Sequence, residues 1–215
     1  MKFTVIIAAY NEEKHIARVV REVAKQKPEE IVVVSDGSTD RTVAEAVAAG
    51  ATVLEHVINQ GKGAALKTGA DYAVKRGAKY LVFLDGDGQH DPREIPAFLK
   101  ELKNHDVVFG TRKREGQMPF LLRFGNWFIS KVIELLYGIK IHDSQGGYRA
   151  MTTKAYKLIR WHARDYSVES EMIAHTGRAK LKYCEIPVKT IYHDAYKGTS
   201  PLDGLVIVAN LIIWK

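Results

Sequence analysis

Short runs of apolar, β-branched residues alternate with segments of helical spacing in the first half of the chain, and no other feature constrains the fold as strongly. The apolar runs cover residues 3–9, 31–35, 51–54, 79–84 and 106–109. Helical spacing fills residues 15–25, 42–49, 63–76 and 92–103 between them. Strands that are apolar on both faces need helices on both sides of their sheet. The alternation therefore predicts an α/β fold with a mostly parallel sheet flanked by helices.

The composition is that of one globular domain. The chain has 215 residues, of which 46% are hydrophobic and 27% are charged, and this is enough apolar material for a buried core. It excludes a disordered tail, a collagen-like fibre and a disulfide scaffold. No linker or repeat divides the chain, so residues 1–215 are expected to form a single domain. The lone cysteine, Cys184, cannot form an internal disulfide, and no signal peptide opens the chain, which favours a cytoplasmic location.

The net charge of +7 suggests an anionic partner, either phosphate groups or an acidic membrane surface. Nucleic acid is not the expected partner, because the aromatic residues do not alternate with basic ones along an exposed strand. The longest apolar stretch, residues 205–214, is too short to span a bilayer.

Polar residues follow three of the expected strands. In parallel sheets, ligands bind beyond the carboxyl ends of the strands. Asp36 after the second strand could bind a ribose or a base, and its alternative role is an Asx-turn before a helix opening at Asp40. Small Ala9 with Tyr10 could lie against a nucleobase, and the alternative there is a helix cap at Asn11. The strand ends therefore predict one composite site.

Two carboxylates one residue apart, Asp85 and Asp87, follow the fourth strand. Such hard oxygen ligands suit Mg²⁺ or Mn²⁺, with a substrate diphosphate completing the coordination. The alternative is an acidic turn that caps the next helix, which Asp91 followed by Pro92 could do alone. A three-glycine dinucleotide motif, a P-loop, a calcium loop and His or Cys spacings typical of zinc are absent from the sequence.

Four motifs appear in a familiar order, namely residues 8–12, 36–42, 59–65 and 85–92. The series resembles the family 2 glycosyltransferases, which are inverting enzymes of the GT-A fold. Within that family the chain is most similar to the dolichol-phosphate mannose synthase branch, because residues 110–112 and 143–149 also match its segments. The resemblance implies that residues 1–110 bind a nucleotide sugar, and that residues 111–215 form an acceptor-side half ending in an apolar helix.

The resemblance also implies roles for individual residues. The nucleotide-binding positions are Ala9, Tyr10, Glu12, Asp36, Lys62 and Gly86. The ligands of Mg²⁺ or Mn²⁺ are Asp85, Asp87 and Gln89. The groups facing the acceptor phosphate are Arg123, Ser130, His193 and Lys197. The acceptor-side structural residues are Asp143 and Arg149, and the catalytic residues are Asp87, Arg112 and Glu171.

The acceptor decides whether the reaction needs a base. The resemblance implies a GDP- or UDP-linked hexose as donor, and charge that develops on the departing diphosphate would be offset by the metal ion and by basic side chains. A polyprenyl (dolichyl) phosphate is already anionic and can attack unaided. A sugar hydroxyl needs a carboxylate base, for which Glu171 is the candidate. The lipid phosphate is favoured, and a non-catalytic nucleotide-sugar-binding module is the third alternative.

The lipid is favoured because of residues 119–137. On a helix they place Arg123, Asn126, Ser130 and Glu134 in one polar stripe within a wide apolar surface. We interpret this segment, with an apolar helix over residues 201–215, as a peripheral contact with the cytoplasmic face of a membrane. The alternatives are a core helix and a homodimer contact. Residues 167–192, between these segments, are expected to end in two strands around Pro187.

Overall fold

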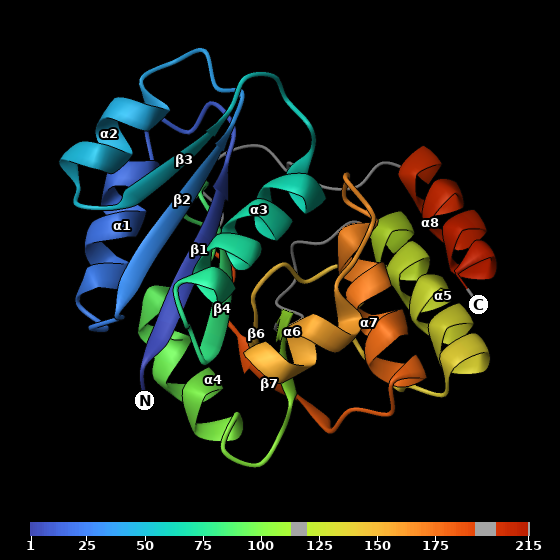
Figure 1. Cartoon of the computed structure of the whole chain (residues 1–215). Coiled ribbons are helices and arrows are strands. Elements are labelled where there is room, and N and C mark those ends of the chain that lie inside the picture. Colours follow the sequence, from blue (N-terminus) through green and yellow to red (C-terminus); the bar gives the residue numbers. More distant parts are fainter. Residues whose placement is uncertain (113–119, 192–200, 215) are drawn as a thin grey trace.

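The computed structural model describes residues 1–112, 120–191 and 201–214, with side chains in the last two ranges described from residues 125 and 206 onward. Seven strands form one sheet in the order β3-β2-β1-β4-β6-β5-β7 (Figure 1). The strands are β1 (Phe3–Ala9), β2 (Glu30–Asp36), β3 (Thr52–His56), β4 (Tyr80–Asp85), β5 (Val107–Arg112), β6 (Arg149–Thr152) and β7 (Tyr183–Val188). Only β6 among them runs antiparallel to its neighbours. The expected mostly parallel α/β sheet is confirmed.

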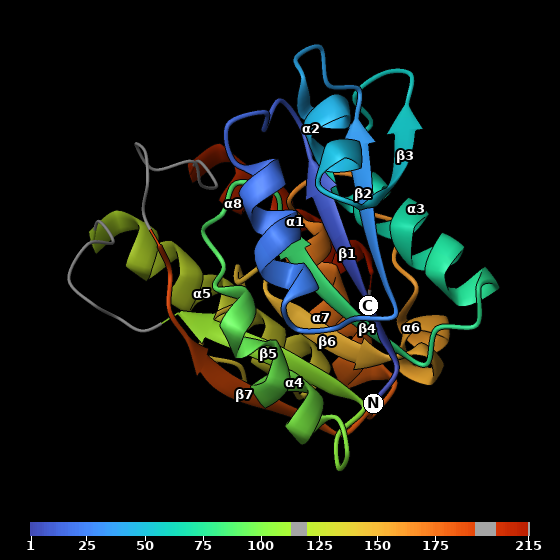
Figure 2. The same cartoon turned by 90° about the vertical axis from the view of Figure 1, so that its left-hand side faces the viewer.

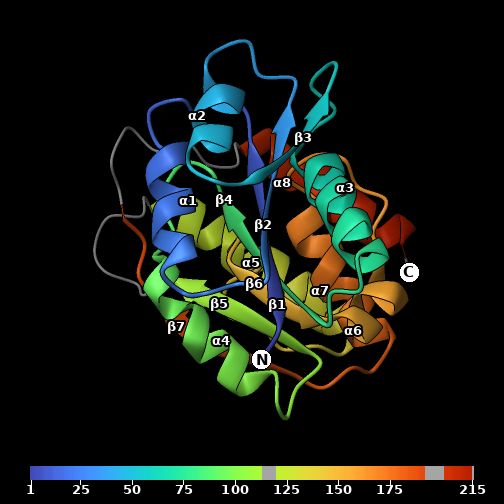
Figure 3. The ribbon, with the colours of Figure 1, turned by 60° about the vertical axis from the view of Figure 1, so that its left-hand side comes forward.

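Helices cover both faces of the sheet, as the doubly apolar strands require. They are α1 (Ile16–Ala24), α2 (Thr42–Ala48), α3 (Lys62–Lys75), the 3₁₀ turn η1 (Pro92–Glu94), α4 (Ile95–Glu101), α5 (Phe120–Tyr137), α6 (Thr153–Ile159), α7 (Val168–Arg178) and α8 (Pro201–Ile213). Figure 3 shows α1, α2 and α4 on one side of the central strands and α3, α6 and α7 on the other. In Figure 2, α1 and α4 lie in front of the sheet.

Successive residues of β1 supply the two cores. Val5 and Ile7 are buried in the cluster that includes residues of α1 and α4. Ile6, between them, is buried in the cluster that includes residues of α3, α5 and α7. Because side chains alternate along a strand, a strand covered on both faces is apolar at every position. This explains the continuous apolar runs of the first half.

In the second half of the chain, the secondary structure differs from the sequence prediction. Residues 183–188 form one strand, β7, so the expectation of two strands around Pro187 was wrong. Thr190 beyond it makes only an isolated bridge with His90. Pro187 is tolerated because β7 lies at the edge of the sheet. The short strand β6 and helix α6 were not expected, since β6 has only four residues directly after a glycine-rich turn.

Helices α5 and α8 pack side by side at the margin of the molecule, next to α7 (Figure 1). Ile129 and Ile133 of α5 and Leu211 of α8 are buried between them. The hydroxyl of Tyr137 donates a hydrogen bond to the backbone oxygen of Leu211 at 2.6 Å. The inner side of α5 therefore belongs to the core, as one of the alternatives predicted from the sequence had it.

The outer sides of the same two helices carry apolar residues that are exposed to solvent. These residues are Trp127, Phe128, Leu135, Val206, Ile212 and Ile213. Asn126 and Ser130, two members of the expected polar stripe, are turned into the protein instead. No helix within the described ranges combines the length and the hydropathy needed to cross a membrane.

Candidate active site

A pocket with a volume of about 720 Å³ opens at the carboxyl ends of β1, β2, β4 and β5. Parallel sheets bind their ligands at this edge because the strand ends and the following loops meet there. The expected residues that line it are Ala9, Tyr10, Glu12, Asp36, Lys62, Asp85, Gly86, Asp87, Gln89 and Arg112. The second half of the chain adds Gln145, Gly147, Asp165, Tyr166, Glu169 and Thr190. The structure therefore brings the donor-side residues of the sequence analysis into one pocket.

Hydrogen bonds join the loops after β1 and β2 at one rim of the pocket. The backbone N–H of Thr39 donates to Asn11 Oδ1 at 2.9 Å, and that of Glu12 donates to Thr42 Oγ1 at 2.7 Å. Asn11 is thus a link between loops and not the cap of α1, so that expectation was wrong. Asp40 Oδ1 accepts from the N–H of Thr42 at 2.9 Å, as expected where α2 opens.

Asp36 is buried at the end of β2 and organises the loop that leads into α3. One of its oxygens lies 2.6 Å from His56 Nδ1 and accepts from the backbone N–H of Gln60 at 3.0 Å. The other accepts from the N–H of Gly61 at 2.8 Å. Its bonds therefore reach across to residues 56–61 and do not form the local Asx-turn that was the alternative. A carboxylate accepts about four hydrogen bonds, which leaves capacity for a ligand.

Two glycines let another backbone segment approach the start of α3. A Cβ atom on Gly61 would lie 2.3 Å from the backbone oxygen of Arg164, and one on Gly63 would lie 2.3 Å from that of Ala163. The N–H of Gly63 donates to the Arg164 oxygen at 2.6 Å. The motif of residues 59–65 thus fixes Lys62 between the two halves of the chain.

Lys62 occupies the centre of the buried charges. Its Nζ lies 2.8 Å from Asp85 Oδ1 and 2.8 Å from Glu169 Oε1. Burial opposes the charged form, but the two carboxylates together outweigh it and raise the pKa of Lys62. Lys62 therefore stays an ammonium group, and it compensates the charge of Asp85.

The two acidic residues after β4 differ in their electrostatic surroundings. Burial opposes ionisation of Asp85, but Lys62 and then His90 lower its pKa on balance. The pKa of Asp87 is raised, first by burial and then by the negative charge of Asp85. The backbone N–H of Gln89 donates to Asp87 Oδ1 at 2.9 Å. A divalent cation beside Asp87 would relieve this repulsion, so the donor set fits such an ion.

Arg112 enters the pocket wall from the end of β5 and is held by Asp143. Its Nε lies 2.7 Å from Asp143 Oδ2, and its Nη2 lies 2.9 Å from Oδ1. Asn126 Nδ2 also donates to Asp143 Oδ1, at 3.1 Å. Burial raises the pKa of Asp143, but the charge of Arg112 and its hydrogen bonds lower it overall. The guanidinium group is thereby given a fixed orientation.

The chain is similar in sequence to a family of known proteins. The family model described as "Glycosyl transferase family 2" matches residues 4–160. These residues include the ends of β1, β2, β4 and β5, at which the pocket opens. The chain belongs to glycosyl transferase family 2.

Two relatives of this glycosyltransferase match it over nearly its whole length. The UDP-N-acetylglucosamine–dolichyl-phosphate N-acetylglucosaminyltransferase of Methanococcus voltae is 32% identical over 98% of this chain and 94% of its own length. The undecaprenyl-phosphate mannosyltransferase of Micrococcus luteus is 27% identical over 100% of this chain and 94% of its own. The two names differ in both the sugar and the polyprenyl chain.

A solved structure confirms the fold of the glycosyltransferase. Glucosyl-3-phosphoglycerate synthase from Mycobacterium tuberculosis, crystallised with Mg²⁺ and UDP, matches with a TM-score of 0.77. The match covers 98% of this chain and 76% of that one at 20% identity. The expected GT-A fold is confirmed.

Arg149 is a fully buried structural residue of this glycosyltransferase. Its Nε donates to the backbone oxygen of Gly146 at 2.8 Å, and its Nη1 donates to that of Glu169 at 2.6 Å. Burial lowers the pKa of Arg149 to about 10. Arg149 thereby ties the glycine-rich turn to the first turn of α7.

Glu171 does not line the pocket, which corrects the expectation that it faces the acceptor. It is fully buried, and its two oxygens accept from the backbone N–H groups of His162 and Ala163 at 2.9 and 2.7 Å. Glu169, two positions before Glu171 on helix α7, lines the pocket instead. The two residues lie about 200° apart around a helix, which sends them to opposite sides.

The four expected acceptor-phosphate residues are not gathered at this pocket by the described part of the structure. Ser130 is buried on α5, and its hydroxyl has no hydrogen-bond partner among the described residues. The side chain of Arg123 lies outside the described residues, as do His193 and Lys197. Sequence reasoning missed Glu169, Gln145 and Tyr166. For Glu169 the only signal was its place in the acidic run of residues 169–171.

Proposed function

We propose that this glycosyltransferase transfers a hexose from a GDP- or UDP-linked donor to a polyprenyl phosphate, with inversion at the sugar. Residues 1–110 hold the donor, and residues 111–215 hold the acceptor. The proposal is supported by the two full-length relatives named for transfer to polyprenyl phosphates. Because those relatives differ in their sugar, the identity of the hexose is left to experiment.

The contacts of the carboxylates on the acceptor side support a phosphate acceptor over a hydroxyl acceptor. Within the described residues, Glu169 is paired with Lys62, Asp143 is paired with Arg112, and Glu171 is bound to two backbone N–H groups. Asp143 is thus held by Arg112, and Glu171 is held by backbone N–H groups away from the pocket, so neither is placed as the base for a substrate hydroxyl. A phosphate monoester is anionic at neutral pH and needs no such base. The alternative, a hydroxyl acceptor with Glu171 as base, is not supported by this geometry.

Asp87, with Asp85 and Gln89, would hold Mg²⁺ or Mn²⁺. The solved neighbour with Mg²⁺ and UDP supports this assignment, together with the raised pKa of Asp87. The bound ion would withdraw negative charge from the departing diphosphate. The ammonium of Lys62, one of the pocket residues nearest to Asp85, adds a second positive charge at that place.

The chain's own residues account for the remaining steps. Ala9, Tyr10 and Asp36 position the nucleoside, with Glu12 and Gly86 at the same wall. Arg112, oriented by Asp143, stabilises phosphate charge as an acceptor oxygen bonds to the anomeric carbon and the bond to the diphosphate breaks. Attack from the side opposite the leaving group inverts the sugar configuration. Asp143 and Arg149 act as positioning residues.

The outer surface of α5 and α8 is proposed to rest on the cytoplasmic face of a membrane. Its exposed aromatic and aliphatic residues, among them Trp127, Phe128 and Leu135, suit the boundary between headgroups and acyl chains. A lipid acceptor is found at that boundary, and a net charge of +7 favours an anionic surface. A homodimer contact is the alternative use of this surface.

An acceptor panel tests the proposed function. The full chain is incubated with GDP- and UDP-linked hexoses, a divalent ion, and either a short polyprenyl phosphate, the matching polyprenol, or a free glycan. We expect a lipid-linked sugar phosphate from the first acceptor alone. Transfer to the polyprenol or the glycan at a similar rate would assign the enzyme to hydroxyl acceptors. Donor binding without any turnover would assign it to the binding modules.

A further inference from the structure

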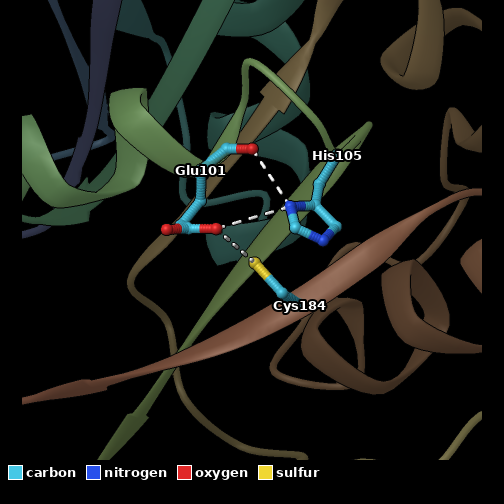
Figure 4. Close-up of side chains that lie close together, drawn as sticks. All are labelled: Glu101, His105 and Cys184. Atoms are coloured by element: carbon cyan, nitrogen blue, oxygen red, sulfur yellow. Dashed lines mark hydrogen bonds and ion pairs between the residues drawn. The ribbon is translucent and has the colours of Figure 1, made fainter.

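Three side chains with metal-binding atoms meet at the end of the sheet opposite the pocket. Glu101 is the last residue of α4, His105 lies in the turn before β5, and Cys184 is the second residue of β7 (Figure 4). The pocket lies where β5 ends, whereas this cluster lies where β5 and β7 begin. No step of the proposed transfer uses these residues.

The donor atoms are spaced for one ion. Glu101 Oε2 lies 3.6 Å from His105 Nδ1 and 3.9 Å from Cys184 Sγ. One donor atom of each residue lies within 4.8 Å of the others. Tetrahedral zinc with bonds of about 2.0–2.3 Å holds its ligand atoms roughly 3.3–3.8 Å apart. The two separations from Glu101 Oε2 are therefore already close to those of a zinc site, and a donor atom of His105 lies within 4.8 Å of Cys184 Sγ.

The backbone beneath the three side chains is braced. The N–H groups of Asp106 and Val107 donate to the backbone oxygen of Lys182 at 2.7 and 3.2 Å. The N–H of Lys182 donates back to Asp106 Oδ2 at 3.0 Å. Cys184 then pairs with Val108 in the ladder between β5 and β7. The turn that carries His105 and the strand that carries Cys184 thus form one rigid unit, which fixes the ligand geometry in advance.

The hydrogen bonds within the cluster show which protons an ion would replace. The Cys184 thiol donates to Glu101 Oε2, and His105 Nδ1 lies 3.1 Å from the backbone oxygen of Glu101. Burial first, and then the charge of Glu101, raises the pKa of Cys184 to about 11, with a smaller effect from Glu185. A protonated thiol of this kind is a poor nucleophile. The carboxylate of Glu101, which lies 3.6 Å from His105 Nδ1 and 3.9 Å from Cys184 Sγ, would attract a cation to this place.

We propose that Glu101, His105 and Cys184 form a zinc site, with water as the fourth ligand. A thiolate, an imidazole and a carboxylate are the ligands that zinc prefers, whereas Mg²⁺ and Mn²⁺ prefer oxygen ligands alone. The thiolate and the carboxylate together neutralise the charge of Zn²⁺. The side chains of Glu101 and His105 are 34% and 28% exposed, so an ion can enter from solvent. The bound ion would clamp the edge strand β7 to the end of α4.

Cobalt provides a direct test, because Co²⁺ accepts the same ligands and its thiolate complexes absorb in the near ultraviolet. Cys184 is the only cysteine of the chain, so a thiolate-to-cobalt band can come from no other residue. Titration of the reduced, metal-free full chain is expected to produce the band with one equivalent of Co²⁺, and Zn²⁺ should abolish it. The absence of the band up to a large excess of Co²⁺ would overturn the proposal.

Variants separate the three-ligand site from binding by the thiol alone. Asp87→Ala removes the expected active-site ligand and should leave the band intact, whereas Cys184→Ser should remove it. His105→Ala should weaken cobalt binding about tenfold or more. If His105→Ala does not fold, as judged by its circular dichroism, Glu101→Gln replaces it with the same expectation. Cobalt affinity unchanged in the folded variant would overturn the proposal, since it would leave the thiol as a solitary ligand.

Discussion

Asp85 and Asp87 look alike in the sequence but have different electrostatic surroundings in the folded chain. The two are one residue apart, but the ion pair with Lys62 is formed by the first of them. Asp87 retains a charge that both burial and Asp85 disfavour. A group in that situation lowers the stability of the fold and raises its affinity for a cation. Stability and function are therefore in conflict at Asp87.

We predict that Asp87→Asn stabilises the metal-free protein at neutral pH. The raised pKa means that ionisation of Asp87 costs more in the folded chain than in the unfolded one. This cost is fully present above the folded pKa and absent below the unfolded pKa. Asn keeps an oxygen for the N–H of Gln89 and removes the charge. Thermal unfolding should show a higher Tm than wild type at pH 7 and a smaller difference in acid.

The same melts with Mn²⁺ provide the control. The ion should raise the Tm of the wild type and leave that of Asp87→Asn nearly unchanged, because a ligand stabilises only the state that binds it. A lower Tm for metal-free Asp87→Asn would mean that the charge of Asp87 is already compensated.

Glu171 is predicted to be a structural residue. Glu171→Gln replaces one accepting oxygen by an NH₂ group and leaves a backbone N–H without its partner. We expect a loss of about 1–3 kcal/mol in the free energy of unfolding, measured by urea denaturation. Glu134→Gln, on the exposed side of α5, is the matched control and should change stability by less than about 0.5 kcal/mol. Folded Glu171→Gln that binds the donor but transfers no sugar would restore Glu171 as the base.

At the scale of elements, the start of α3 depends on two glycines. Gly63→Ala would place a methyl group 2.3 Å from the backbone oxygen of Ala163, so the loop must move away from Lys62. We predict destabilisation of about 2 kcal/mol or more. Among the described residues, no atom outside the backbone of α5 itself lies within 4 Å of a Cβ added to Gly125. Gly125→Ala should therefore stabilise the chain by up to about 1 kcal/mol, because alanine favours helices.

Chemical denaturation of the two glycine variants side by side provides the comparison. Equal stabilities would contradict the close approach of residues 163–164 to α3.

Helices α5 and α8 allow a prediction about the membrane. Leu135 on the outer side of α5 is 84% exposed, and Leu158 on α6 is 66% exposed. Because burying a leucine side chain contributes about 1.5–3 kcal/mol, Leu135→Glu should weaken flotation with anionic liposomes by roughly tenfold or more. Leu158→Glu is the matched control and should float like wild type.

Two results of the flotation experiment would contradict a membrane contact through α5. Equal flotation of both variants would move the membrane contact away from α5. A wild-type chain that does not float and sediments as a dimer would assign the outer surface of α5 and α8 to a homodimer.

For the whole molecule, the sequence predicted the site residues of the donor half better than those of the acceptor half. The sheet and the pocket residues Asp36, Asp85 and Asp87 follow from strand ends, whose position in a parallel sheet is fixed by topology, whereas Lys62 and Arg112 followed only from the family resemblance. The acceptor half was harder because its contacts join distant segments. Glu169 meets Lys62 more than a hundred positions away, and helical spacing alone cannot tell that Glu169 faces the pocket while Glu171 does not.

The proposed zinc site illustrates the same limit. Zinc sites are recognised in sequences by short spacings between ligands. His105 and Cys184 are far apart along the chain and meet only because β7 pairs with β5. Such a site becomes visible only when the order of the strands is known.

The central claim is that a cation at Asp85 and Asp87 assists transfer to a polyprenyl phosphate. It is tested most directly by measuring transfer of labelled hexose to a short polyprenyl phosphate after chelation and after restoring Mn²⁺ or Mg²⁺. We predict that chelation stops transfer, that either ion restores it, and that Asp87→Asn lowers its rate about 100-fold or more with the ion present. Full transfer in the chelated enzyme, or by Asp87→Asn, would contradict the claim.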